Sequence, residues 1–153
     1  MAAINRGRVW MGALVGGVVF NIWSMVVELG LAPTIVGKAR MDIAGMNGWF
    51  LKEPRISTAL FFLVWIVSLF AVSYGMAWVY ASIRATAGKG PSTAAKVGLL
   101  VAFAAGFPLN FAHATFDVLS ARFWMMWALE MGIGAMLAAL AAGWVYQDPP
   151  AAS

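Results

Sequence analysis

Four long, sparsely charged apolar stretches constrain the fold of this chain more than any other feature. They cover residues 9–31, 58–83, 97–119 and 123–146. A helix needs about 20 mainly apolar residues to cross about 30 Å of hydrocarbon. With 63% hydrophobic and 10% charged residues, a soluble domain of 153 residues could not bury this much apolar side chain. The sequence therefore predicts an all-α, integral membrane four-helix bundle.

Little of the chain remains for anything besides these spans. We expect a single transmembrane domain over residues 1–148, with a frayed tail over 149–153. The polar, turn-rich segment 87–91 (AGKGP) predicts a hairpin between the second and third helices. Only residues 120–122 join the third helix to the fourth. Pro108 lies in the middle of the third stretch and is expected to kink that helix.

The first connection, residues 32–57, is much longer than the other two. Apolar residues recur in it at roughly helical spacing: Ile35, Ala39, Ile43, Met46 and Phe50. This spacing favours a short amphipathic helix in the membrane interface, broken at Gly45–Gly48, and the alternative is an irregular loop.

Aromatic and basic residues near the span ends are typical of a multi-pass membrane protein. The aromatic ones form a belt at headgroup depth: Trp10, Trp49, Trp78, Tyr80, Trp144 and Tyr146. Five basic residues fall on each side of the membrane, so their number alone does not orient the chain. Those beside the first helix and in the short second loop favour cytoplasmic N- and C-termini.

A repeated pattern suggests that the two helical hairpins arose by duplication. Gly17, Asn21 and Glu28 in the first helix have the same spacing as Gly106, Asn110 and Asp117 in the third. The second and fourth helices both end in Trp-Val-Tyr, at residues 78–80 and 144–146. Two such hairpins would be related by a pseudo-twofold axis along the membrane normal.

Rows of small residues predict where the helices pack. Because helices in lipid associate by close packing and hydrogen bonds, such rows mark contacts. The three rows are Ala13–Gly17–Asn21, Gly98–Ala102–Gly106–Asn110 and Gly134–Ala138–Ala142. An amide that faced lipid would leave its polar atoms unsatisfied. We therefore expect the first and third helices to approach closely, with Asn21 near Asn110.

Polar side chains inside the spans are expected to form one cluster: Asn21, Ser24, Glu28, Asn110, His113, Asp117 and Glu130. From the helix rise, Glu130 and His113 lie roughly 7 Å from the bilayer centre, and Glu28 and Asp117 roughly 12 Å. All lie toward the long first loop. Charges at such depth cost about 2.5–3.5 kcal/mol unless they face inward and find partners. We predict that Glu130 meets His113 beneath that loop.

Two uses of this cluster remain open. It is either structural, with Glu130 paired to His113 or protonated, or a site for a proton, cation or small polar ligand, with Glu130 titrating and His113 as relay. The leading hypothesis is a small non-enzymatic accessory or structural subunit that associates with itself or a membrane partner. The alternative is a proton- or cation-linked small-solute carrier that uses the same cluster.

Other classes of function find no support in the residue pattern. The chain has no cysteine and one histidine, and it lacks the nucleophile, phosphate-loop and zinc-protease motifs. Its ten basic residues are scattered and mostly flank the spans, which does not indicate nucleic-acid binding. We expect no cofactor, no metal site and no enzymatic activity, and the lipid bilayer as the immediate partner.

The opening INRGRVWMGALVGGVVFNIW, followed by four spans and a terminal AGWVYQD, resembles a group of small, uncharacterised bacterial membrane proteins. These begin with an Asn-x-Gly-Arg-Val stretch that leads into a Gly-rich first helix. The resemblance covers residues 4–23 and, more weakly, 123–147. It implies a bacterial inner-membrane setting and assigns no functional residue.

Overall fold

The computed structural model describes residues 4–35, 46–47, 50–51, 57–116 and 121–146. The first helix consists of α1 (Arg6–Met25), the π-helical η1 (Val26–Leu31) and α2 (Ala32–Ile35). The second is α3 (Thr58–Ala87). The third consists of α4 (Pro91–Val101), the π-helical η3 (Ala102–Gly106) and α5 (Phe107–Phe116), and the fourth is α6 (Ala121–Val145).

The predicted four-helix architecture is confirmed. Among the described residues, four helices are long and apolar enough to cross a membrane, namely Arg6–Leu31, Ala59–Ala87, Pro91–Phe116 and Ala121–Val145. Local signals explain several ends. The side chains of Asn5 and Ser57 cap α1 and α3 by accepting backbone N–H groups at 3.2 Å. Gly88 and Gly90 adopt φ of 90° and 113°, which lets the chain reverse between α3 and α4.

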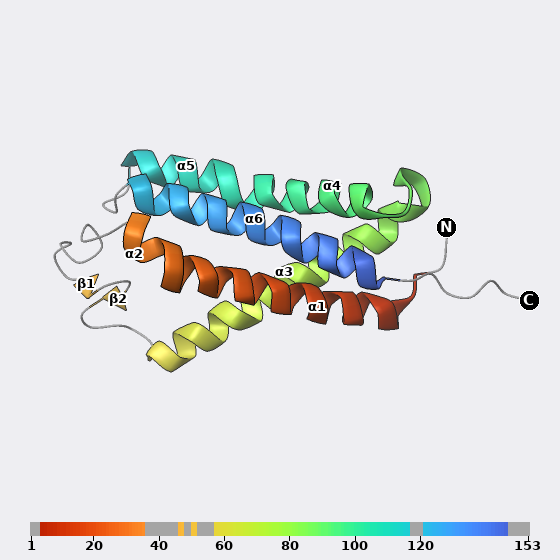
Figure 1. Ribbon diagram of the computed structural model, residues 1–153, viewed down its shortest axis with the longest axis horizontal. Helices are drawn as coiled ribbons and strands as arrows, with labels where there is room; N and C mark the ends of the chain where they lie inside the picture. Colours follow the sequence, from red (N-terminus) through yellow and green to blue (C-terminus); the bar gives the residue numbers. More distant parts are fainter. Residues whose placement is uncertain (1–3, 36–45, 48–49, 52–56, 117–120, 147–153) are drawn as a thin grey trace, which may run out of the picture.

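Helix α6 occupies the centre of the bundle (Figure 1). It packs against α1 on one side and against α4, η3 and α5 on another, and α3 crosses the bundle diagonally. In the most apolar window of each span, 44% of α6 residues are buried but only 17% of α3 residues. The N-terminal half of α3 diverges from the other helices, which leaves space between it and α5 (Figure 1).

Small residues bring α6 into backbone contact with its neighbours. A Cβ atom on Gly16 of α1 would lie 2.7 Å from the carbonyl oxygen of Ala138. On α4, a Cβ atom on Gly98 would lie 2.8 Å from the Cα atom of Met136. The predicted rows that contain Gly98 and Ala138 therefore lie at helix contacts, as close packing in lipid requires, whereas Gly16 belongs to no predicted row.

The expected partners of two of these rows are wrong. The first and third helices do not approach closely, because α6 lies between them. Asn21 and Asn110 each donate to a carbonyl group of their own helix, at 2.8 and 2.6 Å. Each internal bond satisfies one N–H of its amide without a partner helix, and Gly17 packs beneath Phe70 of α3 instead.

The long first connection is only partly described. Ile35 ends α2, while Met46–Asn47 (β1) and Phe50–Leu51 (β2) pair as a two-residue antiparallel ladder. Phe50 is therefore not helical, which corrects that part of the predicted interfacial helix, whereas Met46 lies within the break predicted at Gly45–Gly48. Its other members, Ala39 and Ile43, lie outside the described residues.

The packing is not that of a symmetric duplication. A pseudo-twofold axis would map the α1–α6 contact onto a contact between α3 and the third helix. Helices α1 and α6 pack extensively, whereas α3 and α4 contact each other far less. Duplication as an origin stays a prediction, since the present arrangement places α6 at the centre and α3 at the edge.

Both π-helical segments end two residues before a proline. η1 ends at Leu31 before Pro33, and η3 ends at Gly106 before Pro108. Proline removes a backbone donor and clashes with the preceding turn, and a widened π turn accommodates such a disruption. The predicted irregularity at Pro108 therefore takes the form of a π segment.

Substituting Gly16 with Ala should test the close approach of α1 to α6 and α3. The added methyl group meets the backbone carbonyl of Ala138 in α6 and the hydroxyl group of Ser73 in α3, so we expect a loss of about 1–3 kcal/mol of stability, measured as thermal unfolding in detergent. Gly75→Ala is the control, because nothing lies within 4 Å of its Cβ position. Equal melting temperatures for the two variants would contradict the packing described.

Candidate functional site

A buried carboxyl group links three helices. Glu130 of α6 is only 1% exposed, and the Ser24 hydroxyl group of α1 donates to its Oε1 atom at 2.5 Å. The Trp65 indole N–H of α3 donates in turn to Ser24 Oγ at 3.1 Å. The chain Trp65–Ser24–Glu130 therefore joins α3, α1 and α6 through groups that would each be costly to bury alone.

A second tryptophan holds the backbone at the same place. The indole N–H of Trp23 donates to the main-chain carbonyl oxygen of Glu130 at 3.0 Å. Helix α1 thus contacts both the side chain and the backbone of Glu130. In an apolar solvent these bonds fix the rotation of α1 relative to α6, because a turn of either helix would break them.

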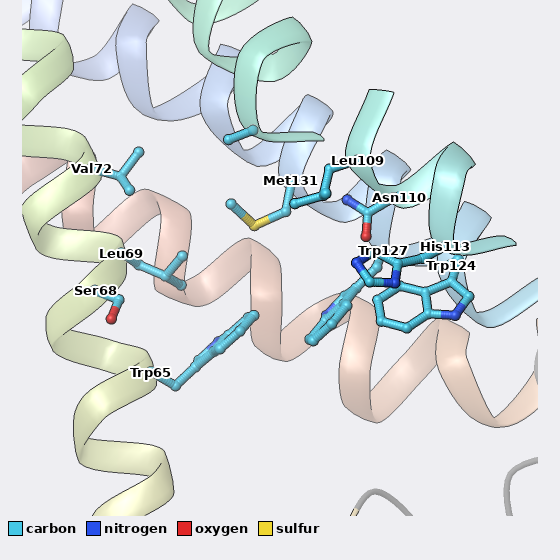
Figure 2. A pocket seen from close by; sticks show the side chains of 11 residues that line it. Trp65, Ser68, Leu69, Val72, Leu109, Asn110, His113, Trp124, Trp127 and Met131 are labelled. Carbon is cyan, nitrogen blue, oxygen red and sulfur yellow. The ribbon is translucent and has the colours of Figure 1, made fainter. Parts of the chain in front are cut away.

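A groove of about 330 Å³ lies beside this network, between α3 and the third helix (Figure 2). Its lining is mainly aromatic and aliphatic: Trp65, Ser68, Leu69, Val72, Ala105, Leu109, Asn110, His113, Trp124, Trp127 and Met131. The rings of Trp65 and Trp127 stack with centroids 5.6 Å apart and planes within 3°. The groove exists because the N-terminal half of α3 diverges from the other helices and leaves one face of α5 uncovered.

Two polar side chains of α5 give the groove hydrogen-bonding capacity. His113 is half-buried, and its ring stacks on Trp124 at a centroid distance of 4.5 Å. Asn110 is buried and donates from Nδ2 to the carbonyl oxygen of Gly106. Its side-chain oxygen points toward His113 (Figure 2). An imidazole and an amide therefore stand at one end of an otherwise apolar groove.

Trp65 belongs to both features. One side of its ring lines the groove against Trp127, and its N–H bonds Ser24 on the path to Glu130. A ligand or helix that displaced this ring would therefore disturb the hydrogen-bond chain. This makes Trp65 the physical connection between the groove and the buried acid.

The structure brings most of the predicted cluster into one half of the bundle. Ser24, Asn110 and Glu130 are buried, and Asn21, Glu28 and His113 are half-buried. Asp117 lies outside the described residues. The hydrogen bonds and ring contacts given above place Glu130 with Ser24, and His113 with Trp124. The pairing of Glu130 with His113 stays a prediction.

Sequence reasoning missed the tryptophans of this site. Of the eight in the chain, the four that do not belong to the predicted belt all lie here: Trp23, Trp65, Trp124 and Trp127. For Trp23 and Trp65 a signal was present, because an indole N–H deep in a span needs an acceptor, and both donate to groups of this network. Trp124 lies near the start of the predicted fourth span, and its ring contacts His113 instead.

The chemistry available here is hydrogen bonding and proton exchange. Across the part of the chain that the structure describes, no three His, Asp or Glu side chains are grouped as metal ligands would be. A carboxyl group, a hydroxyl group and an imidazole can bind a proton or a polar group.

Comparison with known proteins adds no assignment. No family model matches the chain, and no curated protein or solved structure is found to be similar to it. A function must therefore be argued from the geometry of the site.

Two buried serines provide a matched test of the hydrogen-bond chain. Ser24→Ala should lower stability by about 1–3 kcal/mol, because it removes the hydroxyl group that both Trp65 and Glu130 bond. Ser73 is equally buried, and its hydroxyl group has no hydrogen-bond partner among the described residues. Ser73→Ala should leave the melting temperature in detergent unchanged or raise it. A larger loss at Ser73 than at Ser24 would argue against the network.

Proposed function

We propose that the protein is a small, non-enzymatic accessory or structural subunit that associates laterally within the membrane through the groove between α3 and α5. Its partner is a transmembrane segment of another chain or of a second copy. The observation that carries this proposal is the groove itself, which is aromatic, opens beside the diverging half of α3 and contains an amide and an imidazole.

The groove has the two properties that drive association in lipid. Helices there associate by van der Waals packing and by interhelical hydrogen bonds, since burial of apolar surface gains little. Trp65, Trp127 and Met131 offer packing surface, while Asn110 and His113 offer polar contacts. The outer face of α3 is apolar as well, with Leu63 and Val64 more than half exposed, which suits a helix at the edge of an assembly.

The use made of Glu130 supports the same proposal. Its carboxyl group is enclosed and bonded to Ser24, and this bond holds the helices that form the groove. A carboxyl group bonded in this way holds α1 and α6 together. The function of the polar cluster is then to fix the shape of the groove between α3 and α5.

We also propose a bacterial inner-membrane location with cytoplasmic termini. The resemblance of residues 4–23 supports the membrane, and the basic residues beside the first helix and in the short second loop support the orientation. Arg6 and Arg8 lie in the first turn of α1, and Lys89 lies in the turn between α3 and α4.

Blocking the groove tests the proposed association. Ala105→Leu places a larger side chain in the groove lining, whereas Ala104→Leu, in the same exposed turn, adds it outside that lining. We expect native mass spectrometry of discs cut directly from the membrane to show an additional protein subunit with the wild type and A104L. This subunit should be lost with A105L. A monomer in all three samples, or equal retention by both variants, would refute lateral association through the groove.

A proton- or cation-linked carrier is the second candidate. It is favoured by the connection through Trp65, which links the groove to a carboxyl group within the span. Intramembrane acids often mark proton or ion paths. Movement of Trp65 would then couple occupancy of the groove to the surroundings of Glu130.

Proteoliposomes separate the two candidates. For an accessory subunit, we expect no flux above that of empty vesicles when an internal pH-sensitive dye follows an imposed gradient. Glu130→Gln, which keeps an oxygen able to accept from Ser24, should retain the fold and the associated subunit. Proton flux with the wild type that disappears in E130Q would favour the carrier instead.

A further inference from the structure

A second site lies at the opposite end of the bundle, between the start of α1 and the middle of α3. A pocket of about 200 Å³ is lined by Arg6, Val9, Trp10, Tyr74 and Trp78. Arg6 is the first residue of its span, which places the guanidinium group at headgroup depth. The pocket therefore combines a cation with aromatic rings that carry polar N–H and O–H groups.

An apolar groove of about 320 Å³ continues from this pocket toward the centre of the bundle. It shares Trp10 and Tyr74 with the pocket, and their ring centroids lie 4.6 Å apart. The rest of its lining is apolar: Ala13, Leu14, Val67, Phe70 and Ala71. The two cavities follow α1 from its first residue inward, with polar lining at the membrane surface and apolar lining below.

The charge at this end of the bundle is positive. Arg6 and Arg8 lie in the first turn of α1, Arg84 in the last turn of α3, Lys89 in the turn between α3 and α4, and Lys96 in α4. The acidic residues that the structure describes, Glu28 and Glu130, lie in the other half. Asp148 follows α6 in sequence and is outside the described residues. A negatively charged group is therefore the complement that this end favours.

We propose that this site binds one anionic phospholipid, with its phosphate at Arg6 and an acyl chain in the groove between α1 and α3. A guanidinium group forms charge-assisted hydrogen bonds to phosphate oxygens, and indole and phenol rings suit the interface between headgroup and acyl chain. A polar cavity that leads into an apolar one has the chemistry of a single amphipathic molecule. The lipid would fill the space between α1 and α3 on the side away from the α3–α5 groove.

Native mass spectrometry with added lipids tests this site. The purified protein is mixed with equal amounts of dioleoyl phosphatidylglycerol and dioleoyl phosphatidylcholine, and we expect preferential retention of the anionic lipid. Arg6→Gln should reduce that retention roughly five- to tenfold without changing that of phosphatidylcholine. Arg8→Gln is the matched control, because Arg8 lies outside the pocket and contacts the Met11 sulfur at 3.6 Å.

A second pair of variants tests the acyl groove. Ala71→Leu fills it and should reduce retention of both lipids, whereas Ala59→Leu adds the same bulk to an exposed position of α3 outside the groove. Equal retention of the two lipids by the wild type, or no effect of R6Q, would overturn the proposal. So would a lipid-free dimer that A71L disrupts, because a second copy would then occupy the groove.

Discussion

The backbone contact between α1 and α6 is the interaction on which the other features depend. Gly12 and Gly16 allow the two helices to approach until a Cβ atom on either glycine would lie within 3.0 Å of an α6 carbonyl oxygen. In lipid, this closeness is itself a source of stability, since packing replaces the hydrophobic effect. One turn beyond Phe20, the same face of α1 brings Ser24 to Glu130. The positions of Gly12 and Gly16 on α1 thus determine where Ser24 meets Glu130.

The site combines two solutions to the problem of polarity in an apolar solvent. Asn21 and Asn110 bond to the preceding turn of their own helices and need no neighbour. The Glu130 carboxyl group instead accepts a hydrogen bond from Ser24 of a neighbouring helix. Trp65 of a third helix donates to the same serine, so this chain of bonds joins three helices. Only the second solution fixes how one helix is arranged against another, because its hydrogen bonds run between α1, α3 and α6.

The sequence predicts the spans and the inward position of Glu130 because lipid accepts apolar side chains, whereas charged groups must face the bundle interior. The sequence predicts less well which helices contact each other. Gly98 packs on α6 and Gly17 packs beneath Phe70 of α3, although the matched spacing of their rows favours a contact between the first and third helices. A row of small residues shows which face is in contact and carries no information about the partner. Likewise, an amide in a span requires a hydrogen bond, but the acceptor of Asn110 is four residues away in its own helix.

The π-helical segment η3 determines which residues of the third helix can share one face. Gly98, Ala102, Gly106 and Asn110 recur every four residues and are all buried. In a regular α-helix, each four-residue step drifts by about 40°, so the last member would have rotated about 120° from the first. The wider π turn rotates less per residue and corrects this drift.

The π segment accommodates one extra residue without changing the face that α4 and α5 share. If one residue between Ala102 and Gly106 were deleted, eleven steps would separate Gly98 from Asn110, and a regular α-helix would turn them by about 1,100°, only about 20° past three full turns. Asn110 and His113 would therefore stay beside the groove while the π turn disappeared. The π segment can thus be gained or lost by the insertion or deletion of a single residue while both ends of the third helix retain their contacts.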